Sequence, residues 1–164
     1  MKASTIFSIV LTLCLISFTS CAGEYMRISG FTQNGIQYAI IDEHTVSVSG
    51  STSGDAEDIL IIPAKVEHLS TTYTVTGIKR LAFYGCTWLQ TIHLPKTLEF
   101  IESGAFAGCE NMVHITLEAA LPPVFKGKAF DDSVQEKAIL AVPYSVVYMK
   151  DEDWSKFRHI VDLQ

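Results

Sequence analysis

The chain has 164 residues, of which 48% are hydrophobic and 18% are charged, and its formal net charge at pH 7 is -6. This length is enough for one compact domain and not comfortably for two. Binding to a nucleic-acid backbone needs clustered lysines and arginines, so an acidic chain argues against a nucleic-acid partner.

The first residues have the pattern of a secretory signal. Lys2 supplies one positive charge, and the run Ile6–Phe18 that follows is 13 residues long and uncharged. That length suits the hydrophobic region of a signal peptide and falls short of the roughly 20 residues that span a bilayer. The next residues, TSCAG, resemble the lipobox of bacterial lipoproteins, whose cysteine is lipidated and becomes the new N-terminus. We therefore expect a lipoprotein signal peptide over residues 1–20 and lipidation at Cys21.

Two alternatives to the lipoprotein stay open. Phe18 stands where lipoboxes usually have Leu, so the segment could also be an ordinary cleaved signal followed by an incidental cysteine, or an uncleaved anchor. The lipoprotein hypothesis implies attachment to the outer membrane through an N-terminal lipid, at the cell surface. Periplasmic or secreted locations are the alternatives. Acidic residues just after the lipidated cysteine favour surface export, and residues 22–27 (AGEYMR) contain only one, Glu24.

Residues 21–57 are predicted to form an N-terminal β cap. The segments 35–42 (GIQYAIID) and 44–50 (HTVSVSG) alternate between apolar and polar residues and are rich in β-branched side chains. The Asn34–Gly35 dipeptide just before them is a hairpin-turn signal. The small and acidic residues of 50–58 indicate a loop.

A five-residue motif occurs twice in the middle of the chain. Ala82–Cys86 reads AFYGC, and Ala105–Cys109, 23 positions later, reads AFAGC. The longer copies, 77–95 and 100–118, agree mainly at apolar and glycine positions. A unit that cannot bury its own apolar face buries it against its neighbour, and a period near 23 falls in the leucine-rich-repeat range of 20–29 residues.

Weaker copies extend the array over residues 58–143. Short apolar segments recur before or near each copy and predict four stacked strands, at 59–62, 91–94, 114–117 and 139–142. A third copy of the motif, Lys128–Phe130, keeps Ala and Phe and lacks the Gly-Cys pair. The first copy carries an insert, residues 64–78, which we expect to fold back as a hairpin and add to the N-terminal cap.

Residues 144–164 are predicted to form a C-terminal helical cap. Val147, Tyr148, Trp154 and Phe157 would lie over the last strand if this segment formed a short helix or helical turns. Such a cover is expected because an exposed end of a repeat array is an aggregation hazard.

The stretch IESGAFAGCENMVHITL resembles the BspA-type leucine-rich repeat, with its Ile-x-x-x-Ala-Phe-x-x-Cys-x-x-Leu frame. The segment Ala141–Ile160 is similar to the usual C-terminal end of that family. The resemblance covers about two thirds of the chain. It implies a leucine-rich-repeat β-solenoid, a short and mostly β horseshoe with an irregular or 3-10 convex side, an N-terminal β-hairpin cap and a C-terminal helical cap. It also implies a cell-surface or secreted protein, and several members of the family are adhesins.

The two cysteines of the motif occupy one column of the repeat. If Cys86 and Cys109 lie on adjacent turns, their Cα atoms are about 5 Å apart, within disulfide range, and export permits a disulfide. A column of parallel side chains in a core suits packing of free thiols better than bridging. We favour buried free thiols, and a disulfide stays open.

No enzyme is predicted. A nucleophile needs a base within hydrogen-bond reach, and His93 alternates with inward-facing Ile92 and Leu94 and so points away from Cys86. The five histidines form no H-x-x-x-H pair and the cysteines no C-x-x-C pair, so no metal and no cofactor are expected.

The outward side of the four strands is the candidate ligand face. Strand alternation predicts eight side chains on it: Ile59, Ile61, Thr91, His93, His114, Thr116, Ile139 and Ala141. The resemblance to the BspA-type family implies a non-catalytic cell-surface binding module for adhesion or for protein or glycan recognition, with host extracellular matrix among the candidate ligands. The alternative is an envelope accessory or structural lipoprotein that binds a bacterial partner protein.

Overall fold

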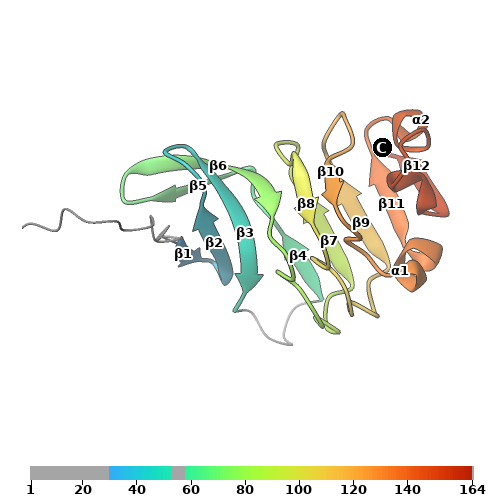
Figure 1. The fold of residues 1–164 in the computed structure, drawn as a ribbon, viewed down its shortest axis with the longest axis horizontal. Helices are drawn as coiled ribbons and strands as arrows, with labels where there is room; N and C mark the ends of the chain where they lie inside the picture. The colour runs from blue at the N-terminus through green and yellow to red at the C-terminus, as the bar shows by residue number, and fades with distance from the viewer. Residues whose placement is uncertain (1–29, 53–57, 164) are drawn as a thin grey trace, which may run out of the picture.

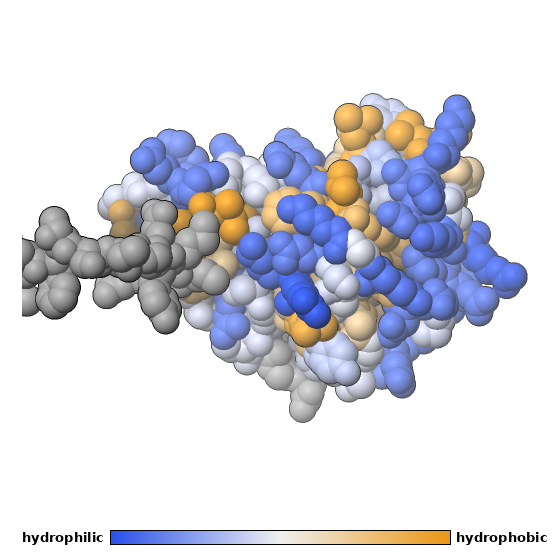
Figure 2. Space-filling model, viewed as in Figure 1, coloured by the Kyte–Doolittle hydropathy of each residue, from blue (hydrophilic) through white to orange (hydrophobic). Residues whose placement is uncertain are grey.

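The computed structural model describes residues 30–52 and 58–163. Cys21 and the predicted signal segment lie outside the described residues. The described chain forms two β-sheets that face each other and enclose one hydrophobic core (Figure 1). In the same view the surface is mainly hydrophilic, with hydrophobic residues interspersed (Figure 2).

One sheet has five strands, all parallel, in the order β12-β11-β9-β7-β4. These strands are β4 (Ile59–Ile61), β7 (Thr91–Leu94), β9 (His114–Leu117), β11 (Ile139–Val142) and β12 (His159–Asp162). The four strands predicted from the repeat coincide with the first four of these within one residue.

The other sheet has seven strands, six of them in the order β1-β2-β3-β6-β8-β10. These are β1 (Gly30–Gln33), β2 (Ile36–Ile40), β3 (Thr45–Ser51), β6 (Thr71–Ile78), β8 (Phe100–Glu102) and β10 (Val124–Lys126), and β5 (Lys65–His68) pairs with the first half of β6. The chain therefore alternates between the sheets along β7, β8, β9, β10 and β11. The side that was expected to be irregular carries a short strand, β8 or β10, in each of these turns.

The inward side chains of the five-stranded sheet form the main wall of the core. Leu60, Ile92, Ile115 and Leu140 are paired in register on adjacent strands and are all buried. Ile78 and Ile101 are likewise paired in register on the opposite sheet and buried. Alternation with period two therefore assigns one row of each strand to the core and the other to solvent.

The repeated motif forms the turns that connect the two sheets on one side. Adjacent turns are hydrogen-bonded through their backbones: the Phe83 N–H donates to the Ala105 carbonyl at 2.8 Å, and the Phe106 N–H donates to the Ala129 carbonyl at 3.0 Å. The third copy keeps this stacking although its sequence is incomplete. Asp131, one position after its Phe, accepts a hydrogen bond from the Gly108 N–H at 2.7 Å.

Two predicted hairpins are present in the N-terminal half. β1 and β2 are antiparallel and joined at Asn34–Gly35, whose φ angles of 49° and 75° suit a tight primed turn. β5 and β6 form the hairpin expected of the insert. β3 then pairs with β6 in parallel, so that the strands before the repeats extend the seven-stranded sheet.

The C-terminal segment differs from the prediction. Its helices are short, α2 (Ser145–Tyr148) and the 3-10 turn η1 (Trp154–Lys156), and the chain then returns as a fifth parallel strand, β12. Tyr148, Trp154 and Phe157 are buried as expected, whereas Val147 is exposed. A further helix, α1 (Asp132–Lys137), precedes β11 and was not predicted.

Candidate binding face

The outward side of the five-stranded sheet consists of two rows of side chains in register, which we call the outer face. One row is Ile59, Thr91, His114, Ile139 and His159, and the other is Ile61, His93, Thr116, Ala141 and Val161. The structure thus places all eight predicted residues on one surface. With strands about 4.8 Å apart, the rows run for about 19 Å across the sheet.

His159 and Val161 were missing from the predicted face because β12 had been assigned to a helical cap. The two β-branched residues Ile160 and Val161 are the only strand signal in His159–Asp162, and the segment does not alternate between apolar and polar residues. It spans only four residues and lacks a copy of the repeat motif in front of it, so the pattern alone could not place it in the sheet.

The outer face has a polar middle, an apolar end at β4 and a mixed end at β12, where His159 lies beside Val161. His93 and His114 lie on adjacent strands, each paired in register with a threonine, Thr116 and Thr91. Ile59 and Ile61, at one end, are 51% and 65% exposed. Neither histidine side chain makes a hydrogen bond or ion pair with the rest of the described chain. The surface can therefore offer imidazole and hydroxyl groups for hydrogen bonds, apolar contact mainly from the isoleucines of β4, and no formally charged group from these two rows.

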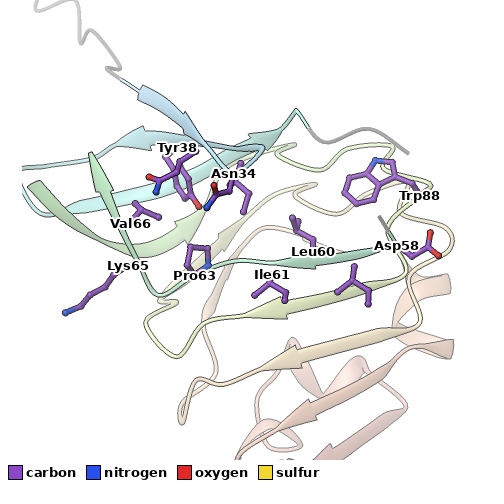
Figure 3. Close-up of a pocket in the computed structure, with 12 residues that line it drawn as sticks. Asn34, Tyr38, Asp58, Leu60, Ile61, Pro63, Lys65, Val66 and Trp88 are labelled. Carbon is purple, nitrogen blue, oxygen red and sulfur yellow. The ribbon is translucent and has the colours of Figure 1, made fainter. Parts of the chain in front are cut away.

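A pocket opens beside β4, at the end of the outer face (Figure 3). Its volume is about 730 Å³, within the 300–1,000 Å³ typical of ligand pockets. Ile59 and Ile61 line one wall, and Ile36 and Tyr38 of β2 line another. No sequence pattern indicates this pocket, because its walls come from segments that meet only in the folded chain. Burial raises the pKa of Tyr38 to about 12, so its hydroxyl stays protonated at neutral pH.

The two thiols of the repeat motif are free in the structure. Cys109 is fully buried, and its Sγ donates to the Phe83 carbonyl at 3.1 Å. Cys86 is only half-buried, so the expectation of two buried thiols was right for Cys109 alone. Burial raises the pKa of both thiols, that of Cys109 to about 12. At neutral pH both are therefore protonated and poorly nucleophilic.

Two further features bear on what the described residues can do. Within 30–52 and 58–163, no group of three or more His, Cys, Asp or Glu side chains is placed to hold a metal ion. Across the same residues, none of the helices combines the length and the apolar character needed to cross a membrane.

The repeat identifies the family of the chain. Residues 63–153 match the model of the BspA type leucine rich repeat region, in six copies. The chain belongs to this family. The match covers more than half of the sequence and contains both full copies of the motif, so the resemblance inferred from the motif is confirmed. The BspA-type repeat also accounts for the recurrence of Ala, Phe, Gly and Cys at the turns.

Solved structures of other leucine-rich repeat proteins have the same kind of fold. A leucine rich cell surface protein from Faecalibacterium prausnitzii is 19% identical with a TM-score of 0.53, and the match covers 70% of this chain and 33% of that one. A leucine-rich repeat protein from Bacteroides capillosus is 14% identical with a TM-score of 0.52, over 83% of this chain and 99% of that one. This chain therefore spans about a third of the length of the cell surface protein. Comparison with curated proteins gave no match.

Proposed function

We propose that the chain is a non-catalytic binding module of the bacterial cell surface, which recognises a protein or glycan partner through the outer face. The observation that carries the proposal is the face itself: two rows of five exposed or half-exposed side chains, uncharged, with imidazoles and hydroxyls beside an apolar end at β4. The family and the similarity to the leucine rich cell surface protein of Faecalibacterium prausnitzii support the location.

The face suits a polar, extended partner better than a small metabolite. It is the exposed side of a sheet, so it offers a broad contact area and does not enclose a ligand. Hydrogen bonds from His93 and His114 would give specificity, and the isoleucines and Val161 would add apolar contact. An adhesive role toward host matrix proteins is one form of this proposal, and recognition of an envelope partner is the other.

Substitution of the two central histidines tests the face. We expect the double variant His93→Ala with His114→Ala to lose at least tenfold in affinity for a partner found by screening purified matrix proteins and glycan arrays. His44→Ala, on the turn before β3, is the matched control because this histidine is exposed and lies outside both rows. Unchanged affinity of the double variant would place binding elsewhere on the molecule.

The location is tested separately on cells. Lipidation at Cys21 predicts that the chain partitions with membranes and that Cys21→Ala releases it. Protease treatment of intact cells should then degrade the chain, while a periplasmic marker protein survives. Protection from the protease would contradict surface display and leave the envelope partner as the ligand class.

A further inference from the structure

The two sheets end unequally on the N-terminal side. The five-stranded sheet stops at β4, whereas the other sheet continues past β6 through β3, β2 and β1. The pocket lies in this step: its walls are β4, the inward side of β2, and the start of β5 (Figure 3). A further strand added beside β4 would therefore lie over β2 and its neighbours, which face no strand of the five-stranded sheet.

The edge of β4 that faces the pocket presents backbone groups that pair with no other described strand. The Ile62 N–H donates to the His93 carbonyl at 3.0 Å, and the Asp58 carbonyl accepts from the Thr91 N–H at 2.9 Å. Successive backbone groups of a strand point in alternate directions, so the N–H and C=O groups of Ile59 and Ile61 point away from β7. Within the described residues no strand pairs with β4 on that side.

The walls of the pocket suit alternate apolar side chains. Ile36 and Tyr38 are buried beneath it, and Leu60 and Val66 add apolar surface. Ile59 and Ile61 are the most exposed isoleucines of the described chain. An added strand would therefore gain backbone hydrogen bonds along one side and burial of every second side chain, which is how extended peptides are recognised at sheet edges.

The two ends of the pocket carry opposite charges. Asp58 precedes β4, and Lys65 follows it at the far end of the pocket (Figure 3). Neither side chain forms an ion pair within the described residues. All strands of this sheet are parallel. A strand added in the same sense has its N-terminal end beside Asp58 and its C-terminal end beside Lys65.

We propose that the edge of β4 is a strand-addition site for an extended segment of a partner protein. The segment lies parallel to β4, has small apolar residues at alternate positions, a basic residue toward its N-terminal end and an acidic residue toward its C-terminal end. The site shares Ile59 and Ile61 with the outer face, but it does not depend on His93 or His114. It can therefore exist whether or not the outer face binds a ligand.

The test uses two labelled seven-residue peptides with blocked ends, so that only the side chains carry charge. One reads Lys-Thr-Val-Thr-Val-Thr-Glu, and the other has the Lys and Glu exchanged. Fluorescence anisotropy with the purified full-length chain measures both affinities. We expect the first peptide to bind about two- to thirtyfold more tightly, because it gains two exposed charge pairs and each such pair is weak. In the variant Asp58→Lys with Lys65→Glu the preference should invert.

A second pair of variants tests the backbone contact. Ile61→Pro removes the N–H that points into the pocket, but it leaves the hydrogen bonds between β4 and β7 intact. We expect it to lower the affinity for both peptides at least tenfold. Ile61→Val keeps the N–H and a β-branched side chain, and should bind nearly as the unaltered chain does. Thermal melts of both variants check that the fold is retained, and the charge-exchanged variant remains a test if Ile61→Pro does not fold.

Three results would overturn the proposal. The first is failure of both peptides to bind, and the second is a preference that the charge exchange leaves unchanged. The third is sedimentation of the chain as a dimer that Ile61→Pro dissociates, which would make a second copy the occupant. The double histidine variant separates the two sites, since it should leave peptide affinity unaltered.

Discussion

The ring of Phe106 lies nearly parallel to the ring of Phe83, with centroids 5.3 Å apart and planes inclined by 7°. On its other side the ring of Phe130 stacks at 4.8 Å and 11°. The three rings come from three successive copies of the motif and are all buried. The third copy thus keeps the Phe although it lacks the Gly-Cys pair, because the ring is the part of the motif that packs against the neighbouring copies.

Truncation of the central ring should be among the most destabilising changes in the core. Phe106→Ala leaves a cavity between two rings and is expected to lower the free energy of unfolding by about 3–5 kcal/mol. Urea denaturation at pH 7 measures this change. Tyr84→Ala is the matched control, because Tyr84 belongs to the same motif and is 67% exposed; a change within about 0.5 kcal/mol is expected there. Equal losses in the two variants would refute the role of the stack.

The two motif glycines should respond differently to the same substitution. Gly85 and Gly108 both have positive φ, 70° and 76°, so an alanine at either costs about 1–2 kcal/mol in backbone strain. A Cβ on Gly108 would also lie 3.1 Å from the Gly85 Cα, whereas a Cβ on Gly85 meets nothing within 4 Å. We expect Gly108→Ala to be the more destabilising in urea denaturation, since adjacent turns must separate. A larger loss for Gly85→Ala would contradict this account.

The repeat predicted much of the fold because its information is local. Alternation within Thr91–Leu94 and His114–Leu117 assigns one row to the core, and the fixed offset between copies brings equivalent strands together in register. The same reasoning placed the central residues of the outer face. The Asn34–Gly35 turn was equally readable, since its backbone conformation favours those two residue types.

The features that were missed depend on contacts between distant segments. β12 is specified by the burial of Trp154 and Phe157, which returns the chain to the edge of β11, and by pairing of Ile160 with Leu140. The pocket depends on how far one sheet extends beyond the other. Neither quantity is encoded in a local pattern, so sequence periodicity could not reveal β12 or the strand-addition site.

Alkaline pH should weaken the fold through Cys109. Its pKa rises from an ordinary 9.0 to about 12, first because of burial and then because of Cys86 nearby. Between these values the folded state keeps a proton that the unfolded state has lost, so the free energy of unfolding falls as pH rises. Cys109→Ala removes this contribution and should give a shallower decline in urea denaturation between pH 8 and about 10.5, where one proton corresponds to about 1.4 kcal/mol per pH unit. Tyr38 is retained in both proteins, so the difference isolates the thiol, and parallel curves would contradict the prediction.

Two buried hydrogen bonds connect the C-terminal segment to the repeats. The Tyr148 hydroxyl donates to the Ala119 carbonyl at 2.7 Å, and the Trp154 Nε1–H donates to the Pro123 carbonyl at 2.8 Å. Both rings are fully buried, and Trp154 contacts Phe125 and Phe130. That residues 144–164 cap the array stays a prediction, and these contacts are the reason to test it.

Removal of this segment is therefore expected to make the protein insoluble, because it uncovers the Phe125 and Phe130 rings together with the edge of β11. Tyr148→Phe keeps the ring and removes only the hydroxyl, so it should remain soluble and lose about 1–3 kcal/mol for the unsatisfied carbonyl. The soluble fraction after expression and a thermal melt measure both variants. Trp154→Phe is the companion change, with a larger expected loss since ring volume goes as well. A soluble, monomeric protein ending at residue 143, with a normal melting transition, would show that the repeats need no cap at this end.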